Sequence, residues 1–178
     1  MIRAFTTAIS VAALGLITAL PTTAEEPTGG VVSIGGAVTE IIFALGAQDQ
    51  VVARDTTSSY PPEAAALPDV GYMRALSPEG VLATGPKLII AEEGAGPPET
   101  IEVLEQADIP FVIVPDDYTA EGVSAKIRAV GQALGKEPQA EALAAEVHQK
   151  LAEVSRATQD RPAAERKRVM FILSTQGG

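Results

Sequence analysis

Four short apolar segments, each followed by a stretch with helical periodicity, constrain the fold of this chain more than any other feature. The apolar segments contain no polar alternation, which is typical of parallel strands buried on both faces. They are residues Val31–Ile34, Val51–Ala53, Leu88–Ala91 and Phe111–Val114. The helical stretches are residues Val38–Leu45, Ser77–Thr84, Pro98–Gln106 and Ala120–Leu134. Strands that alternate with helices predict an α/β fold, a Rossmann-like parallel sheet with flanking helices.

The start of the chain differs from the rest and predicts a signal peptide over residues 1–24. Arg3 is its only charged residue, and the apolar run over residues 8–20 is shorter than the roughly 20 residues that a membrane-spanning helix needs. Small residues then lead to a change to acidic sequence after Ala24, as at a signal cleavage site. A buried N-terminal helix is the alternative, but the run lacks an amphipathic period. We therefore expect export, with an N-terminal α/β lobe over residues 25–136.

A long amphipathic pattern follows this lobe. Apolar residues recur at steps of three and four, which predicts one long helix over residues 137–160. A short basic segment comes next, and its simplest interpretation is a solvated surface. The apolar run Val169–Leu173 then precedes a glycine pair, repeating the pattern at the start of the lobe. We therefore expect residues 161–178 to be a linker and the first strand of a second lobe that is essentially missing from this chain.

Composition excludes several classes of function. Thirteen Lys and Arg residues against 23 Asp and Glu residues give a formal net charge of −10, so we expect no nucleic acid and no anionic membrane surface as a partner. The absence of cysteine excludes disulfides, thiolate metal sites, a cysteine nucleophile and a cysteine-linked lipid anchor. His148 is the only histidine, which leaves zinc sites and Ser-His-Asp triads without their usual groups.

The glycine pair after the first predicted strand raises the question of a nucleotide-dependent enzyme. Gly35 and Gly36 lie in the run GGAVTE, which lacks both the third glycine of GxGxxG and the lysine of a P-loop. A tight structural turn explains the pair better. Because no convincing acid–base set accompanies it, we expect a binding protein and not an enzyme.

The loop Gly-Tyr-Met-Arg-Ala-Leu, residues 71–76, contains the most informative polar pair. It precedes the helix expected at Ser77, which places Tyr72 and Arg74 at a sheet edge, where α/β proteins bind ligands. If the loop is extended, both side chains face the same side, and the guanidinium favours the phenolate over the phenol. A phenolate suits ferric iron, and tyrosine is a known axial ligand of haem. From spacing alone, an ordinary surface loop is still the simpler interpretation, as it is for Tyr60 before its two prolines.

Longer motifs resemble a known family. The runs TEIIFALGA and SPEGVLATGPKLIIA are similar to the periplasmic proteins that bind ferric siderophores and cobalamin, in which one long helix joins two α/β lobes. The runs DTTSSYP and GYMR resemble the haem branch of that class, the haemin-binding proteins of ABC haem uptake systems. The resemblance implies a monomeric periplasmic carrier that delivers ferric haem to an inner-membrane ABC permease. Because the family has a complete second lobe, the chain looks truncated.

The same resemblance implies roles for three residues. Tyr72 would be the axial ligand of the haem iron, and Arg74 would support its phenolate by charge and hydrogen bonding. Glu79, in the SPEG turn, matches the lobe-surface glutamate that docks on permease arginines. A glutamate at a helix N-terminus is also explained by the helix dipole, so both readings of Glu79 stay open.

The sequence leaves two alternatives to a haem carrier open. The first is a carrier of a ferric siderophore or cobalamin, from the same class. A siderophore already saturates its iron with oxygen ligands and needs no protein tyrosine, so the GYMR run favours haem. The second alternative is a truncated chain that binds no ligand.

Overall fold

Four parallel strands form the sheet that the sequence predicts. The structure of the chain is a computed structural model, and it describes residues 29–159 and 162–172. The strands are β1 (Val31–Ile34), β2 (Val51–Arg54), β3 (Leu88–Glu92) and β4 (Phe111–Val114), in the sheet order β2-β1-β3-β4. Every neighbouring pair is parallel. The predicted α/β class is confirmed, whereas the predicted signal peptide lies outside the described residues.

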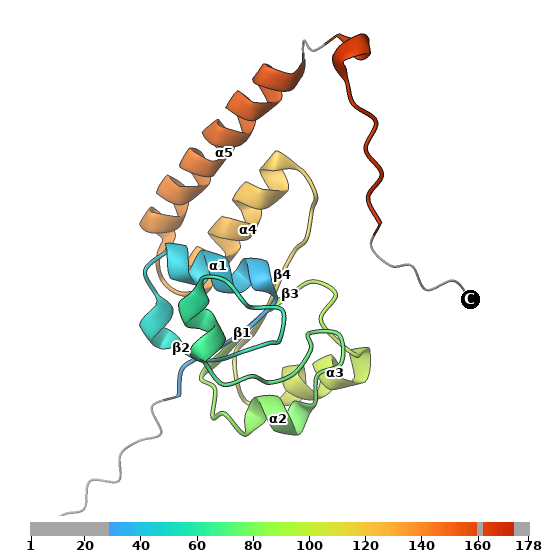
Figure 1. The fold of residues 1–178 in the computed structure, drawn as a ribbon. Coiled ribbons are helices and arrows are strands. Elements are labelled where there is room, and N and C mark those ends of the chain that lie inside the picture. Colours follow the sequence, from blue (N-terminus) through green and yellow to red (C-terminus); the bar gives the residue numbers. More distant parts are fainter. Residues whose placement is uncertain (1–28, 160–161, 173–178) are drawn as a thin grey trace, which may run out of the picture.

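Helices cover both faces of this sheet (Figure 1). They are α1 (Gly36–Ala44), α2 (Pro78–Leu82), α3 (Pro98–Gln106), α4 (Ala120–Ala133) and α5 (Glu137–Gln159). Short 3₁₀ turns lie at η1 (Gln48–Gln50), η2 (Pro62–Ala66) and η3 (Ala163–Glu165). Helices α1, α4 and α5 pack on one face, and α2 and α3 pack on the other.

The central strand β1 shows why its sequence has no polar alternation. Val31 packs into the core under α1, α4 and α5, whereas Val32 and Ile34 pack into the core under α2 and α3. Its polar residue, Ser33, is buried as well and hydrogen-bonds the Thr39 hydroxyl at 2.7 Å. Both faces of β1 are therefore covered, as its apolar sequence predicts.

The ends of α1 are set by two glycines. Gly35 has φ +107° and directs the chain from β1 straight into the helix, which begins at Gly36, two residues before the expected Val38. The helix ends at Ala44, and Gly46 follows with φ +64°, a conformation that glycine adopts without the steric cost of a side chain.

The long helix α5 packs on the lobe along only part of its length. Gly131 of α4 lies so close to Ala140 of α5 that a Cβ at Gly131 would stand 2.2 Å from the Ala140 Cβ, so this crossing requires glycine. An ion pair between Arg128 and Glu141, at 2.6 Å, flanks the contact. Farther along α5, Val154 is 64% exposed. The helix therefore extends past the lobe. The predicted boundaries between the domains stay predictions.

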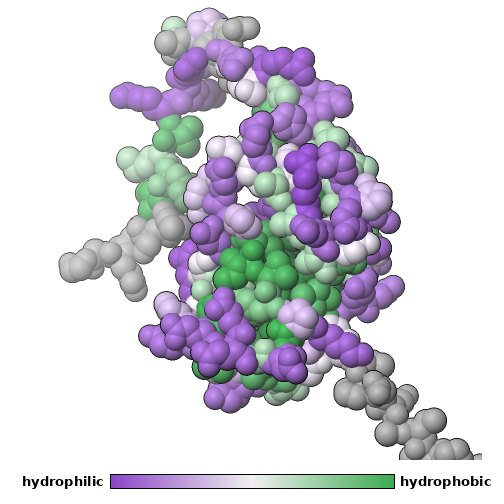
Figure 2. Space-filling model, turned by 180° about the vertical axis from the view of Figure 1, so that it is seen from behind, coloured by the Kyte–Doolittle hydropathy of each residue, from purple (hydrophilic) through white to green (hydrophobic). Residues whose placement is uncertain are grey.

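Apolar side chains are exposed on strand β4 and on the segment 169–172. Strand β4 is an edge of the sheet, with Ile113 exposed, and the view from behind shows an apolar area in the middle of that side (Figure 2). The expected strand at Val169–Leu173 does not form over residues 169–172, which are exposed and lack sheet pairing. A strand forms only with a partner strand, and none of the described strands pairs with this segment.

Helix α5 is the longest helix of the lobe, and its sequence is rich in charged residues. Within residues 29–159 and 162–172, no helix combines the length and the apolar character that crossing a membrane requires.

Candidate binding site at the carboxyl edge of the sheet

The loops that follow the four strands converge at one edge of the sheet. Residues 55–61 follow β2, residues 93–97 follow β3 and residues 115–119 follow β4, beside the turn at Gly35 between β1 and α1. In open parallel sheets, ligands bind at the carboxyl ends of the strands. This edge is therefore the place to look for a site.

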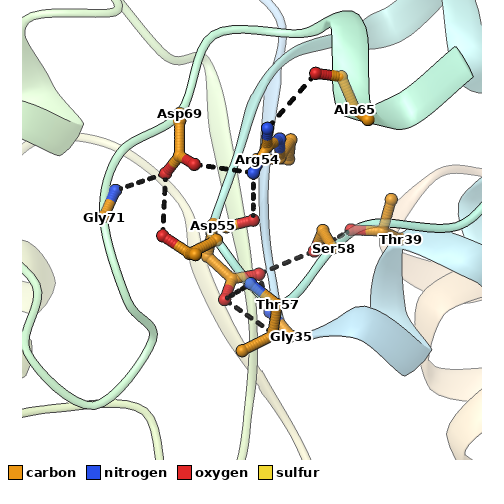
Figure 3. Close-up of polar contacts among 10 residues, drawn as sticks. Gly35, Thr39, Arg54, Asp55, Thr57, Ser58, Ala65, Asp69 and Gly71 are labelled. Atoms are coloured by element: carbon orange, nitrogen blue, oxygen red, sulfur yellow. Dashed lines mark hydrogen bonds and ion pairs between the residues drawn. The ribbon is translucent and has the colours of Figure 1, made fainter. Parts of the chain in front are cut away.

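Asp55 is the buried anchor of this edge (Figure 3). Its carboxylate accepts hydrogen bonds from the backbone N–H groups of Gly35 and Thr57, both at 2.9 Å. The hydroxyl groups of Thr57 and Ser58 donate to it at 2.7 and 2.6 Å. Burial acts to raise the pKa of Asp55, but these hydrogen bonds to the charged form outweigh burial and hold that pKa below its ordinary value. Asp55 ties the first turn of the lobe to the loop after β2.

A chain of hydroxyl groups continues from this anchor into the lobe. The Thr39 hydroxyl donates to Ser58 Oγ at 2.7 Å and pairs with Ser33 Oγ at the same distance. The backbone N–H of Gly35, the first residue of the glycine pair, is already used in a hydrogen bond to the Asp55 carboxylate. The arrangement agrees with the interpretation of the pair as a structural turn.

A second polar cluster positions the segment before Tyr72. Arg54 Nη1 donates to Asp69 Oδ2 at 2.7 Å and to the Asp55 carbonyl at 3.1 Å. The other Asp69 oxygen accepts from the Gly71 N–H at 2.8 Å and from the Thr56 hydroxyl at 3.1 Å. Gly71 has φ +99°, which a residue with a side chain rarely adopts. These contacts of Arg54, Asp69 and Gly71 (Figure 3) fix the direction of the chain just before Tyr72.

Tyr72 and Arg74 lie on a tight turn, and the assumption that this loop is extended is wrong. The Ala75 N–H donates to the Tyr72 carbonyl at 2.8 Å, which closes the turn. Between the two residues, Met73 is buried, whereas Tyr72 is 47% exposed and Arg74 is exposed as well. Strand geometry therefore does not place the two side chains on one face, but both face solvent beside the same buried residue.

Met73 fastens this turn to both neighbouring loops. Its sulfur atom lies 3.9 Å from the Thr57 hydroxyl, and its carbonyl accepts from the Gly96 N–H at 2.8 Å. The Gly96 carbonyl in turn accepts from the Leu76 N–H at 2.9 Å. The exposed Tyr72 thus stands on a loop that is held between the loops after β2 and β3.

Glu79 lies in the first turn of α2, the helix that follows the turn of Tyr72 and Arg74 in the chain. The Ser77 hydroxyl donates to Glu79 Oε2 at 2.8 Å and accepts from the Gly80 N–H at 3.2 Å. Hydrogen bonds from the Glu79 backbone and from Ser77 lower the pKa of this exposed carboxyl group. Glu79 is therefore a charged surface residue that also takes part in the cap of α2.

A buried lysine organises the other end of the edge. Lys126 of α4 forms ion pairs with Glu92, at the end of β3, and with Asp116, at 2.6 Å. Burial acts to lower the pKa of Lys126, but the two carboxylates outweigh it and raise that pKa above its ordinary value. The Asp116 N–H also donates to Glu93 Oε2 at 2.9 Å. The loop after β4 is therefore held to β3 and α4.

Tyr118 projects from this same loop and is 91% exposed. The neighbouring Asp116 carboxylate raises the pKa of Tyr118, chiefly through hydrogen bonding. The charge of Arg74 acts on that pKa in the opposite direction and more weakly. The loop of Tyr118 and the turn of Arg74 are both hydrogen-bonded to the loop after β3, through the Asp116 N–H to Glu93 and through the Met73 carbonyl to Gly96.

A groove of about 950 Å³ opens next to Tyr118. Its floor is apolar and comes from α1, α4 and α5, and its rim contains two tyrosines and several carboxylates. The apolar side chains include Ile41, Phe43, Ile127 and Leu143. The tyrosines are Tyr60 and Tyr118, and the carboxylates include Glu40, Glu63 and Asp117. Tyr72 does not line this groove, but the turn of Tyr72 and the loop of Tyr118, which does line it, are both hydrogen-bonded to the loop after β3.

Sequence reasoning singled out Tyr72 and Arg74 but missed Tyr118, Lys126 and Asp116. No sequence motif marks these three residues, which all follow β4 in the chain. The parallel pairing of β3 with β4 brings them to the edge of the sheet where the loop after β3 also lies. His148 lies apart from them, in a separate pocket between α4 and α5. Among the described residues, no group of three or more His, Cys, Asp or Glu side chains is arranged to hold a metal ion.

Comparison with known proteins agrees with the fold. The model of a family described as periplasmic binding protein matches residues 31–178. The apo structure of the periplasmic heme-binding protein RhuT from Roseiflexus sp. RS-1 is 42% identical, with a TM-score of 0.70 over 75% of this chain and 52% of that chain. The heme-binding protein BhuT, in complex with two hemes, is 38% identical, with a TM-score of 0.69 over 74% of this chain and 50% of that one.

A curated relative has a different ligand. The vitamin B12-binding protein of Pectobacterium atrosepticum is 31% identical over 82% of this chain and 53% of its own length. The chain thus spans about half the length of these relatives.

The chain belongs to the periplasmic binding protein family. These relatives are named as binding proteins, and another curated relative, from Bacillus subtilis and 30% identical over 81% of this chain and 46% of its own length, is named an ABC transporter substrate-binding lipoprotein. The fold expected from the resemblance, an α/β lobe followed by a long helix, is confirmed.

Proposed function

We propose that this chain is the haem-binding component of a periplasmic ABC uptake system and that it presents ferric haem to an inner-membrane permease. The observation that carries the proposal is the half-exposed Tyr72 on a fixed turn at the carboxyl edge of the sheet. The likeness to two heme-binding proteins at 42% and 38% identity supports the same ligand.

In this proposal, Tyr72 binds the haem iron through its phenolate oxygen. Ferric iron is a hard cation that accepts tyrosinate as an axial ligand. The exposed side chain of Tyr72 leaves room for a porphyrin to approach, and the buried Met73 fixes the backbone beneath it. Arg74 supplies positive charge beside the anionic ligand.

Titration with ferric haem tests this function. We expect the purified protein to bind haem with the absorption spectrum of a ferric tyrosinate complex. An unchanged spectrum across the titration would instead support the alternative in which the chain binds no ligand.

Cobalamin is the second candidate, because a curated relative at 31% identity is named for vitamin B12. A ferric siderophore is a weaker alternative, since its iron already has a full set of oxygen ligands. The exposed phenol and the neighbouring guanidinium favour haem over both, because they offer an iron ligand and a countercharge that ferric haem can use.

Replacing Arg74 with alanine is expected to weaken haem binding without abolishing it. A hydrogen bond to a charged group contributes roughly 1 to 3 kcal/mol, so the affinity falls by about 5- to 150-fold. The pH at which the tyrosinate spectrum is lost shifts upward, because the phenolate forms less readily without the cation.

Lys87→Ala is the matched control for Arg74→Ala. It removes the same charge from an exposed site at the opposite end of β3, so it should leave affinity and pH profile as in the wild type. An Arg74→Ala variant that titrated like the Lys87→Ala variant would contradict the role of Arg74.

Glu79 is proposed to contact an arginine of the permease. Glu79→Gln keeps an oxygen that can accept from the Ser77 hydroxyl but removes the charge, so it separates docking from helix capping. We expect normal haem binding and thermal stability together with weaker stimulation of the permease's ATPase activity.

Glu121→Gln provides the control for Glu79→Gln, because Glu121 lies in the first turn of α4 on the other face of the sheet. Equal ATPase stimulation by the wild type and both variants would contradict docking through Glu79.

A further inference from the structure

Tyr118 is the most exposed aromatic residue at the binding edge, and nothing in the lobe's own packing explains its position. Its side chain is 91% exposed, compared with 47% for Tyr72 and 61% for Tyr60. A large aromatic side chain that remains in water on a loop at a ligand-binding edge is an informative departure from the usual distribution of aromatic residues.

The backbone on both sides of Tyr118 is held in place. Asp116 pairs with the buried Lys126, and its N–H donates to Glu93. On the other side, the Thr119 hydroxyl accepts from the Gly122 N–H at 2.9 Å and caps α4. Because the loop is already ordered, contact between the Tyr118 ring and a ligand costs little further backbone entropy.

The surroundings of Tyr118 join the two parts of the edge. Its loop is hydrogen-bonded to Glu93, and the turn of Tyr72 is hydrogen-bonded to Gly96, so both are joined to the loop after β3, while its side chain lines the apolar groove. A flat ligand that is bound at Tyr72 and extends across the loop after β3 would therefore meet the Tyr118 ring.

The phenol of an ordinary tyrosine is neutral near neutral pH. The Asp116 carboxylate beside Tyr118 acts in the same direction, because it raises the pKa of the phenol, chiefly through hydrogen bonding. Asp116 itself stays charged, because hydrogen bonding to Lys126 lowers its pKa.

Building on the proposed haem function, we infer that Tyr118 is a second haem-contacting residue, which packs its ring against the porphyrin as a neutral phenol while Tyr72 binds the iron. Aromatic rings that pack on a π-system gain energy both from buried area and from ring geometry.

The charge around the groove agrees with a porphyrin edge as the occupant. Glu40, Glu63 and Asp117 lie at the rim, over an apolar floor. Carboxylates repel the anionic propionates of haem, so the apolar edge of the macrocycle faces the groove and the propionates point away from it.

Haem titrations of two Tyr118 variants test this inference. Tyr118→Phe keeps the ring, so we expect the tyrosinate spectrum and an affinity within about threefold of the wild type. Tyr118→Ala removes the ring, so we expect the same spectrum but an affinity lower by about 5- to 30-fold. Val103→Ala, an exposed apolar site on α3 at the other face of the sheet, is the control and should bind like the wild type.

Each other outcome overturns a distinct statement. If Tyr118→Ala binds haem like the wild type, Tyr118 makes no contact, although the proposed function stands. If Tyr118→Phe loses the tyrosinate spectrum, Tyr118 is the iron ligand and its assignment as a neutral phenol is wrong. If the wild-type protein itself binds no haem, the proposed function fails and the role of Tyr118 fails with it.

Discussion

Tyr72→Phe is expected to eliminate the ferric tyrosinate spectrum and to weaken haem binding by more than about 100-fold, since the loss of a ligand exceeds the 10- to 100-fold effect of residues that only support ligands. The substitution removes one oxygen atom from a half-exposed side chain. The fold should therefore survive, and circular dichroism should match that of the wild type. Haem titration followed by absorption measures both the spectrum and the affinity.

Tyr60→Phe is the matched control for the spectrum, because it removes a phenol oxygen from the same edge of the sheet. We expect Tyr60→Phe to keep the tyrosinate spectrum. A Tyr72→Phe variant that also kept it would contradict the assignment of Tyr72 as the iron ligand.

Asp55→Ala is expected to lower the free energy of unfolding by about 3 kcal/mol or more. Two buried donors, the Gly35 N–H and the Ser58 hydroxyl, would lose their acceptor, at about 1 to 3 kcal/mol each. Urea unfolding followed by circular dichroism measures the change. Asp108→Ala, at an exposed site, should stay within about 0.5 kcal/mol of the wild type.

The pH dependence of stability isolates the charge of Asp55. Its pKa in the folded protein lies below the unfolded value of about 3.9, so its contribution is complete above that pH and is lost as the pH falls through the folded pKa. Asp55→Asn removes this contribution at every pH. The stability difference between wild type and Asp55→Asn should therefore shrink below about pH 4. A difference that stayed constant into acid would mean that the Asp55 charge is not stabilised by its partners.

The elements of the lobe could be predicted from the sequence because the central strands β1 and β3 are buried on both faces and the flanking helices have regular apolar spacing. β1 and β4 have the bounds that their sequences predict, and α3 begins and ends at the expected residues. The helix α2 is shorter than expected, since Ser77 serves as its cap and Leu82 is its last residue. The segment 169–172 has a strand-like sequence but lacks a partner strand, which no local pattern can supply.

The candidate site was predictable only in part. Tyr72 and Arg74 stand in one short motif, and the structure places both on an exposed turn at the binding edge. Tyr118 has no motif around it, and its loop is held at the binding edge by the contacts of Asp116 with Lys126 and Glu93. The turn that replaces the expected extended loop depends on the contact of Met73 with Thr57 and on the bond from Gly96, both of which are long-range.

Parallel titration of the purified protein with ferric haem and with cobalamin tests the central claim most directly. The account predicts saturable haem binding with a ferric tyrosinate spectrum that depends on Tyr72, and no binding of cobalamin at the same concentrations. Tight binding of cobalamin without a haem-induced tyrosinate spectrum would contradict it and would assign the chain to the second ligand of its family.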